Sequence, residues 1–289
     1  MAYGMQQGAT IRSGLNFSCT GSRLRQSAVK ERKTMPSLLC AHVPWPRLVE
    51  HRDYLLGQRI NPELYLPAEA LDTLDEALLR GFAAELADHG LSCTIHATFM
   101  DLNPGSVDLV IREATRQRVE QTLAVAEILR PRVIVFHPGY SRLTYGSAVE
   151  TWVANSADFW RAHLPRIREI GCLIALENIF EEEPSTLLQV LERINDPLVG
   201  HCFDSGHFNM FATVSLQEWF AVLGERIVES HLHDNHGQTD EHLPVGEGEI
   251  DFGLVTALLK QYAPEAVWTL EAHSRERLER ARTNIMQYL

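Results

Sequence analysis

The feature that most constrains the fold is an eightfold alternation, from residue 35 onward, of short apolar runs with longer amphipathic segments. The apolar runs are nearly continuous in Val, Ile, Leu and Ala, as is typical of strands buried on both faces of a parallel sheet. The predicted strands are residues 38–43, 63–66, 91–96, 133–137, 173–177, 199–204, 227–231 and 267–271.

The amphipathic segments between these runs predict helices. Residues 108–129 carry an apolar stripe with a period of 3.6 residues and stop at Arg130-Pro131. Residues 75–89 and 148–170 are each followed by glycine, the usual residue just past a helix C-terminus. The N-caps expected for the four later helices are Ser185, Ser215, Asp251 and Ser274.

Eight β–α units over about 250 residues predict an α/β fold, a single closed (β/α)8 TIM barrel. Residues 35–289 are expected to form this one domain. Residues 1–34 lack periodicity, and we expect them to be a disordered or non-native extension. An open, doubly wound sheet is the alternative fold, but none of the predicted strands is followed by a glycine-rich phosphate-binding motif.

Composition limits the classes of function. The chain has a net charge of −12, and residues 1–34 hold six basic residues and one acid, so residues 35–289 carry −17 and should bind polyanions poorly. Lys260 is the only lysine beyond residue 33, and its helical context places it on the surface, which excludes Schiff-base catalysis. The absence of a long apolar run predicts no membrane span. The five cysteines show no C-x-x-C spacing, so we expect buried free thiols and a cytoplasmic protein.

Side chains that commonly bind metals stand at or just after the ends of six consecutive predicted strands. In a barrel these positions converge on the C-terminal rim, where active sites are built. A carboxylate that ends an apolar run is costly to bury unless a proton, a cation or a metal pairs with it. One such residue could belong to a core salt bridge, but nine at one rim favour a metal site. The nine are His96, His137, Glu177, Asp204, His207, His231, Asp240, His242 and Glu271.

The densest part of this predicted site is the stretch 226–252. Imidazole and carboxylate groups are the ligands that Zn²⁺, Mn²⁺, Fe²⁺ and Co²⁺ prefer. Asp240 and His242 would share one side of an extended backbone because side chains alternate with a period of two. A solvated polar loop with incidental histidines is the alternative. Of the other histidines, we expect structural or outer roles for His42, His201 and His273, and surface positions for His51, His89 and His163.

The ordered motifs resemble those of the xylose isomerase-like superfamily, which joins sugar-phosphate isomerases and epimerases to the endonuclease IV type of AP endonuclease. The resemblance spans about residues 38–273, nearly the whole body of the chain. Its motifs are I-H-A-T-F-M-D-L-N at His96, His137-Pro-Gly, Leu176-Glu177-Asn178, Phe203-Asp204-Ser-Gly-His207, His231-Leu-His-Asp234, Asp240-x-His242 with G-E-G, and Leu270-Glu271.

The resemblance implies two different metal sites. The isomerases and epimerases typically place four ligands around one divalent ion, and the matching residues are Glu177, Asp204, His231 and Glu271. The endonuclease IV branch uses three zinc ions, and all nine ligand positions have a match, with Glu177 and Glu271 bridging. The chain departs from that branch in A-H-V-P-W-P-R-L, which does not resemble its DNA-reading loops. Nucleic acid is therefore a possible but not a favoured partner.

Three hypotheses about the chemistry remain open. The leading one is hydrolysis of a small phosphorylated substrate, for which two or three ions, expected to be Zn²⁺, activate a bridging hydroxide. The alternative is isomerisation or epimerisation of a sugar or sugar phosphate with one Mn²⁺, Co²⁺ or Mg²⁺. In that reaction Glu177 and Glu271 would move the proton and His207 would bind the substrate. The third is a catalytically silent barrel that binds a metabolite.

Further polar residues near the strand ends are expected to orient ligands or substrate. They are Asn178, Asn209, His233, Asp234 and His236, with Arg142 as a possible helper at a phosphate group. Sugar phosphates, a cobamide-like phosphodiester and damaged DNA all stay open as substrates.

Overall fold

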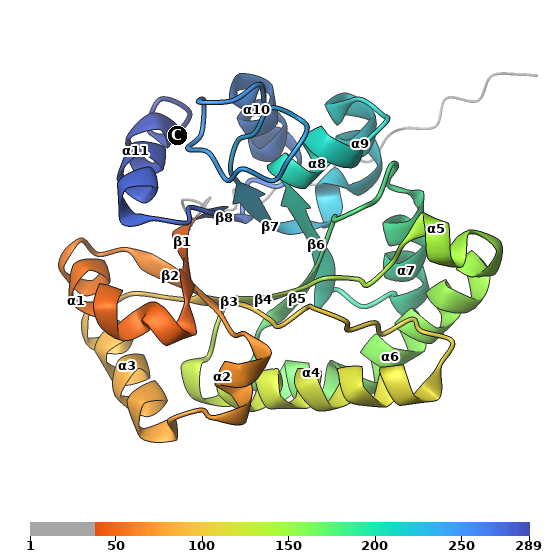
Figure 1. Cartoon of the computed structure of the whole chain (residues 1–289), viewed down its shortest axis with the longest axis horizontal. Coiled ribbons are helices and arrows are strands. Elements are labelled where there is room, and N and C mark those ends of the chain that lie inside the picture. The colour runs from red at the N-terminus through yellow and green to blue at the C-terminus, as the bar shows by residue number, and fades with distance from the viewer. Residues whose placement is uncertain (1–37) are drawn as a thin grey trace, which may run out of the picture. The chain divides into compact units, whose positions relative to one another are not determined.

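The computed structural model describes residues 38–289, and the predicted extension over residues 1–34 lies outside them. Eight parallel strands form a closed barrel in sequence order, because β1 pairs with both β2 and β8 (Figure 1). This confirms the predicted (β/α)8 barrel. The strands are β1 (Leu39–Pro44), β2 (Asn61–Tyr65), β3 (Thr94–His96), β4 (Val133–Phe136), β5 (Leu173–Glu177), β6 (Val199–Asp204), β7 (Ile227–Leu232) and β8 (Val267–Leu270).

The largest difference from the predicted strands is at the start of β3, and the other bounds differ by no more than two residues. β3 begins at Thr94 rather than at residue 91. The backbone N–H of Ser92 donates to the side chain of Asn61 on β2, at 3.0 Å, and not to a backbone carbonyl of that strand. At the C-terminal ends the register brings Asp204 opposite His231. Parallel strands in this register carry their terminal side chains to the same mouth of the barrel.

The helices lie outside the ring of strands, as Figure 1 shows. They are α1 (Leu48–Gly57), α2 (Ala68–Asp72), α3 (Glu76–Asp88), α4 (Leu109–Leu129), α5 (Arg142–Tyr145), α6 (Val149–Ile170), α7 (Ser185–Ile194), α8 (Ser205–Phe211), α9 (Leu216–Leu223), α10 (Phe252–Tyr262) and α11 (Arg275–Ile285). Short 3-10 turns occupy Trp45–Arg47, Gly146–Ala148 and Gly224–Arg226. None of the helices between residues 38 and 289 combines the length and the apolar character that crossing a bilayer requires.

Most of the expected helix caps are present. The side chains of Asp251 and Ser274 accept hydrogen bonds from the first turns of α10 and α11, and Ser215 forms a capping box with Glu218 on α9. The prediction for Ser185 is wrong. Ser185 is the first residue of α7, and its hydroxyl donates to the Glu183 carboxylate, so it does not cap the helix.

Two apolar clusters fill the molecule. The larger lies between sheet and helices and contains Trp152, Trp160 and Trp219, each almost wholly buried. The smaller consists of alternate strand residues that face the barrel axis: Cys40, Val133, Val135, Ala175, Cys202 and Val267. Side chains two residues further along the same strands also face inward, toward the C-terminal mouth. The polar side chains at the C-terminal mouth therefore lie directly above this small apolar cluster in the barrel interior.

Two minor expectations can be judged here. Cys40, Cys93, Cys172 and Cys202 are buried free thiols, as expected, whereas Cys19 lies outside the described residues. The surface position predicted for His163 is wrong. The helical stripe of α6 turns this side chain inward, where it is 1% exposed and its Nδ1 lies at hydrogen-bond distance, 2.8 Å, from the Phe159 carbonyl.

Candidate metal centre

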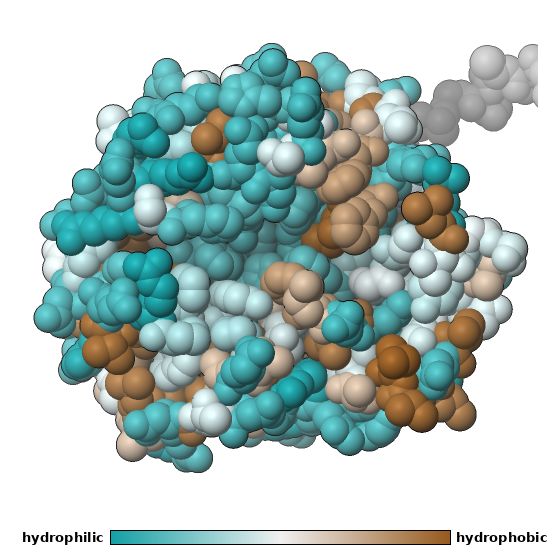
Figure 2. Space-filling view, in the orientation of Figure 1, coloured by the Kyte–Doolittle hydropathy of each residue, from teal (hydrophilic) through white to brown (hydrophobic). Residues whose placement is uncertain are grey.

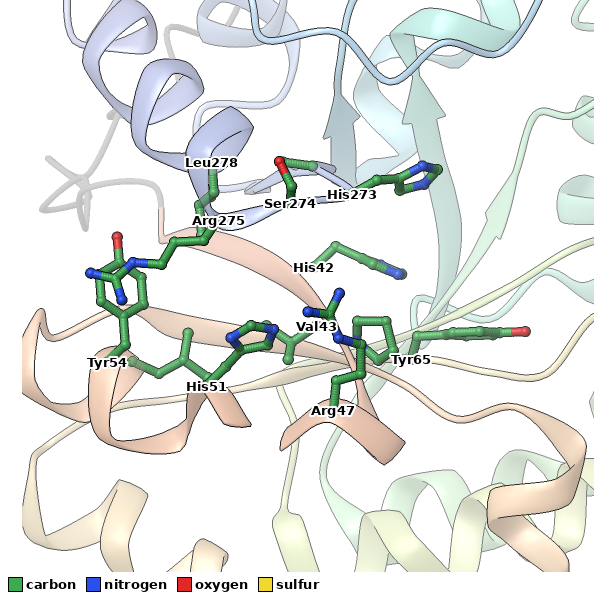
Figure 3. A pocket seen from close by; sticks show the side chains of 13 residues that line it. His42, Val43, Arg47, His51, Tyr54, Tyr65, His273, Ser274, Arg275 and Leu278 are labelled. Carbon is green, nitrogen blue, oxygen red and sulfur yellow. The ribbon is translucent and has the colours of Figure 1, made fainter. Parts of the chain in front are cut away.

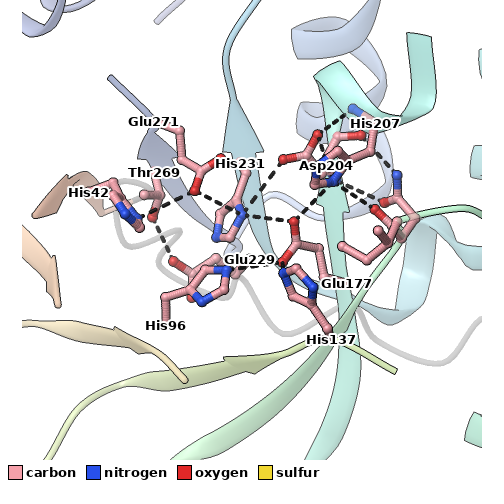
Figure 4. A network of polar contacts seen from close by, with 12 residues as sticks. His42, His96, His137, Glu177, Asp204, His207, Glu229, His231, Thr269 and Glu271 are labelled. Atoms are coloured by element: carbon pink, nitrogen blue, oxygen red, sulfur yellow. Dashed lines mark hydrogen bonds and ion pairs between the residues drawn. The ribbon is translucent and has the colours of Figure 1, made fainter. Parts of the chain in front are cut away.

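The structure brings all nine of the predicted ligand residues together at the C-terminal mouth of the barrel. Figure 4 labels these residues except Asp240 and His242. Six come from the ends of strands or from the residue that follows a strand, one from the first turn of α8, and two from the segment between β7 and α10. The hollow seen from this side is lined by hydrophilic residues (Figure 2).

His231 is the centre of the group. Its Nδ1 atom is buried and has no hydrogen-bond partner. It lies 3.4 Å from Glu177 Oε1, 3.8 Å from Asp204 Oδ2 and 3.9 Å from Glu271 Oε1. Ligand atoms that each stand about 2.1 Å from one tetrahedral ion are about 3.4 Å apart. The three contacts of His231 Nδ1 therefore lie at or slightly beyond the spacing that one divalent ion requires.

The other ring nitrogen of His231 is held by a residue that sequence reasoning missed. Its Nε2 lies 3.0 Å from Glu63 Oε2, and Glu63 Oε1 lies 2.9 Å from His42 Nδ1. Burial by itself would raise the pKa of Glu63, but the His231 imidazole outweighs it and lowers that pKa to about 2. A carboxylate behind a histidine fixes which nitrogen faces the metal. In the sequence, the only hint of this role is a glutamate next to Pro62 within a strand. Its complete burial is seen in the structure.

A second group gathers on the far oxygen of Glu177. His96 Nε2 and His137 Nε2 each lie 3.3 Å from Glu177 Oε2. That oxygen is buried and accepts no hydrogen bond. The ligand atoms of His96, His137 and Glu177 lie close enough together to share one cation. The two oxygens of Glu177 thus face two neighbouring groups of ligands.

A third group forms around Asp240. Its Oδ2 atom lies 2.9 Å from His242 Nε2 and 3.5 Å from His207 Nε2. The ring of His242 stacks on that of His233 at 4.0 Å, and its backbone is held at a φ of 47°. A positive φ is costly for a histidine, and such strain is often found at functional sites.

The electrostatics of the centre suit a cation. Burial by itself would lower the pKa of His96 and of His207, but nearby carboxylates raise these values to about 9 and about 12. Burial opposes the shift in Glu177 too, yet His137 and His231 hold the pKa of Glu177 well below its usual range. Without a metal the centre balances its carboxylates with protons on histidine. Metal ions and protons compete for such ligands, so the donor set fits divalent ions.

Several of the residues expected to orient ligands hold the backbone near the centre. Asn178 donates from its side chain to the Asp204 carbonyl and accepts from the Asp204 backbone N–H, at 2.9 and 2.8 Å, and so ties β5 to β6. Its carbonyl lies 3.1 Å from His207 Nδ1. Asn209 bonds Asn235 at 2.9 Å, beside the same segment.

Asp234 fastens the segment between β7 and α10. Its carboxylate accepts hydrogen bonds from the backbone N–H groups of Asn235, Gly246, Gly248 and Ile250 at 2.8 to 3.1 Å. These bonds fold the segment back on itself, and Asp240 and His242 stand within the loop that they close. Asp234 therefore faces the backbone and not the predicted metal position.

His233 lies closer to the centre than expected, and two other residues lie away from it. His233 Nε2 stands 3.1 Å from Asp204 Oδ2 and 3.6 Å from Glu271 Oε2, and its donor atoms group with those of His242 and Glu271. His236 is 52% exposed and pairs with Glu241, while Arg142 is 61% exposed and pairs with Glu182. Within residues 38–289 neither makes a hydrogen bond or ion pair to the nine residues.

Comparisons with known proteins agree with this architecture. The chain is 29% identical over 216 residues to the uncharacterized protein MJ1311 of Methanocaldococcus jannaschii, covering 72% of this chain and 74% of that protein. The structure of the TTHB071 protein from Thermus thermophilus, soaked with ZnCl2, is 26% identical, with a TM-score of 0.73 over 86% of this chain and 97% of that one.

More distant likenesses show the fold alone. A D-tagatose 3-epimerase-like protein is 24% identical, with a TM-score of 0.73 over 88% of this chain and 97% of that one. A D-psicose 3-epimerase crystallised in the presence of D-fructose is 14% identical, with a TM-score of 0.68 over 83% and 86%.

The family match is a separate finding. The model of the family described as "Xylose isomerase-like TIM barrel" matches residues 62–288. This chain therefore belongs to the xylose isomerase-like TIM barrel family.

Proposed function

We propose that this protein is a divalent-metal-dependent enzyme that isomerises or epimerises a small sugar or sugar derivative. Glu177, Asp204, His231 and Glu271 bind the ion. The likeness to sugar 3-epimerases supports this proposal over the phosphoester hydrolysis that the sequence favoured. The likeness to a protein soaked with zinc chloride supports a divalent-metal site under either reaction.

The observation that carries the proposal is the pair of contacts made by His231. One ring nitrogen is fixed by Glu63 at 3.0 Å, and the other is unpartnered and faces three carboxylates at 3.4 to 3.9 Å. A buried nitrogen without a hydrogen bond is costly unless something occupies the space in front of it. A divalent cation satisfies the nitrogen and the three carboxylates together.

The chain's own residues then have distinct tasks. A divalent ion at this position supplies Lewis-acid polarisation of a sugar carbonyl and its neighbouring hydroxyl. Glu177 and Glu271 each bring one carboxylate oxygen to Nδ1 of His231, at 3.4 and 3.9 Å. Burial opposes the shift, but histidines hold the pKa of each well below its usual range. Each can therefore take up a proton as a carboxylate. One glutamate would take the proton from the carbon next to the carbonyl, and the other, after taking up a proton from water, would return it to the opposite face.

His207 binds the substrate in this proposal. Its Nε2 faces Asp240 at 3.5 Å, and its Nδ1 lies 3.1 Å from the Asn178 carbonyl. Because the contact of Nδ1 fixes the ring, Nε2 is the atom that can turn from its longer contact with Asp240 to donate to a substrate hydroxyl. The carboxylate of Asp204 accepts a hydrogen bond from the backbone N–H of His207 at 2.6 Å. This bond ties Asp204, a predicted metal ligand, to the start of α8.

The test is proton exchange together with metal counting. We expect about one Mn²⁺, Co²⁺ or Mg²⁺ per chain by mass spectrometry, and deuterium at the carbon next to the carbonyl when ketoses are incubated in deuterated water. Glu177→Gln should slow this exchange about 100-fold or more. Glu192→Gln, at an exposed position on α7, is the matched control. Absence of exchange across ketohexoses and their phosphates would refute the proposal.

A second candidate function rests on the two outer groups of ligands. A single ion gives no role to His96 and His137, whose Nε2 atoms each lie 3.3 Å from an unpartnered oxygen of Glu177. It also gives no role to the pair Asp240 and His242. Two or three Zn²⁺ ions would employ all of them, and phosphoester hydrolysis is the reaction that such clusters serve. About three zinc ions per chain would favour this candidate, and a protein that binds no metal would favour a silent metabolite-binding barrel.

His137→Ala separates the two candidates. Under the proposed function the variant keeps its central ion and most of its proton exchange. Under the second candidate it loses one ligand of the cluster, and phosphodiester cleavage should fall below detection. Cleavage of a chromogenic phosphodiester at the wild-type rate by this variant would exclude the multinuclear mechanism.

A further inference from the structure

A cavity of about 260 Å³ lies beside the metal centre, and neither the proposed reaction nor its ligands account for it. It is formed by the segment from β1 into α1 on one side and by the segment from β8 into α11 on the other. Figure 3 shows Arg47, His51 and His42 on the first side and His273 and Arg275 on the second.

The cavity adjoins the metal centre, because two of its lining residues also contact predicted metal ligands. His42 Nδ1 lies 3.4 Å from Glu271 Oε1. The ring of His273 stacks on that of His242, with centroids 4.0 Å apart. One small molecule can therefore have one end at the metal and the other in this cavity.

The charge of the lining is opposite to that of the body. Arg47 and Arg275 give it positive charge, and among the described residues that line it there is no aspartate or glutamate. The remainder of the molecule is strongly acidic, since the chain as a whole carries −12. A local concentration of basic side chains in an acidic protein selects small anions and disfavours long polyanions.

Arg47 and Arg275 are each held by weak contacts that an anion could replace. The guanidinium of Arg275 lies 3.9 Å above the ring of Tyr54, which fixes its orientation through a cation–π contact. Arg275 pairs with Glu279 at 3.0 Å, and Arg47 pairs with Glu50 at 3.2 Å, outside the lining. All four side chains are about half exposed or more. Exposed ion pairs of this kind are weak, so both guanidinium groups remain available to an anion.

We propose that this cavity binds an anionic end group, a phosphate or a carboxylate, of the sugar whose reacting carbons lie at the metal centre. The proposal rests on the proposed isomerase or epimerase function and names its substrate class as acidic sugars. A guanidinium group pairs with either anion through two parallel hydrogen bonds, which gives direction as well as attraction.

The first test is binding, which does not depend on turnover. Full-length protein loaded with Mn²⁺ is titrated calorimetrically with inorganic phosphate and, separately, with acetate. We expect the Arg47→Gln, Arg275→Gln double variant to bind the preferred anion about tenfold or more weakly, the loss of one to two charge-assisted hydrogen bonds. Arg80→Gln, which removes an exposed arginine paired with Glu76 on α3, should bind as wild type does.

The two anions identify the source of the charge. Tighter binding of phosphate assigns a sugar phosphate, and tighter binding of acetate assigns a sugar acid. Equal binding of both anions by the double variant and by wild type would overturn the proposal, because the anion would then sit on the metal. The single variants, compared by thermal melting, show whether either substitution disturbs the fold.

The second test distinguishes this inference from the function it rests on. With a ketose phosphate as substrate, the double variant should raise KM about tenfold with little change in kcat. With the neutral ketose it should change neither. An equal effect on both substrates overturns the anion site while leaving the isomerase in place. Lack of exchange with either substrate, combined with anion binding that depends on the arginines, overturns the function and leaves the anion site.

Discussion

His231 shows how one residue can depend on another that is 168 positions away in the sequence. Its Nε2 faces Glu63 across the barrel, and this contact turns Nδ1 toward Glu177, Asp204 and Glu271. Glu63 in turn contacts His42, so the orientation of the central ligand is set from β1 and β2. The metal position thus depends on Glu63 and His42, which orient His231, as well as on the ligands themselves.

Glu63→Gln should weaken metal binding. The amide keeps the size of the side chain but removes the charge that holds the His231 ring, and such outer contacts are typically worth about 10- to 100-fold in metal affinity. The affinity is measured by competition with a chromophoric chelator. Glu76→Gln, at an exposed site on α3, is the matched control and should leave the affinity unchanged. Identical affinities for wild type and Glu63→Gln would show that His231 is oriented by other contacts.

At the scale of elements, α8 packs against β7 so closely that only glycine fits between them. A Cβ atom on Gly206 would come within 2.0 Å of the ring of His233. The same ring stacks on His242 and faces Asp204, so the packing of α8 positions part of the metal centre. The segment that follows β7 is held separately by the carboxylate of Asp234.

Gly206→Ala should therefore destabilise the fold and disturb the metal centre together. Overpacking of this kind costs roughly 1–3 kcal/mol, measured by urea unfolding, and displacement of His233 should also weaken metal binding. Gly81→Ala is the control. Gly81 lies within α3 with nothing in the way of a Cβ atom, so alanine there should stabilise the protein by about 0.5–1 kcal/mol. A Gly206→Ala variant as stable as wild type would mean that α8 shifts freely.

For the whole molecule, the barrel contains three titratable groups, His96, His207 and Glu229, whose pKa values are all raised. Burial lowers the pKa of His96 and His207, but carboxylates outweigh it and raise the values to about 9 and about 12. Burial, reinforced by Glu63, raises the pKa of Glu229 inside the barrel to about 8. When the pKa of a group is higher in the folded state than in the unfolded state, its contribution to the free energy of unfolding is greatest at pH values below the unfolded-state pKa. This contribution is lost as the pH rises toward the folded-state pKa.

The metal-free protein should accordingly lose stability as the pH rises from about 6.5 to 9, with a slope on the order of 1.4 kcal/mol per pH unit for each proton released on unfolding. The measurement is urea unfolding at pH values of about 6, 7.5 and 9, spanning this range, after treatment with a chelator. Added Mn²⁺ should reduce the slope, because a bound cation replaces the protons. Stability that is constant or rises over this range would contradict the raised pKa values.

Much of this protein follows from its sequence because the determining rules are local or topological. Nearly continuous apolar runs separated by helical segments specify parallel strands, and eight of them close into a barrel. Since all parallel strands run the same way, residues at their C-terminal ends, such as Glu177 and His231, must meet at one mouth. The resemblance to the family rests on the same ordered strand ends.

Tertiary structure decided the contacts that cross the barrel. Glu63 faces His231, and Asp234 turns to four backbone N–H groups, and neither follows from periodicity. The arginine-lined cavity also exists only because closure brings β1 beside β8. The sequence could place side chains on strands and at strand ends, but which of them face one another depends on closure and register, and those are fixed when the whole chain packs.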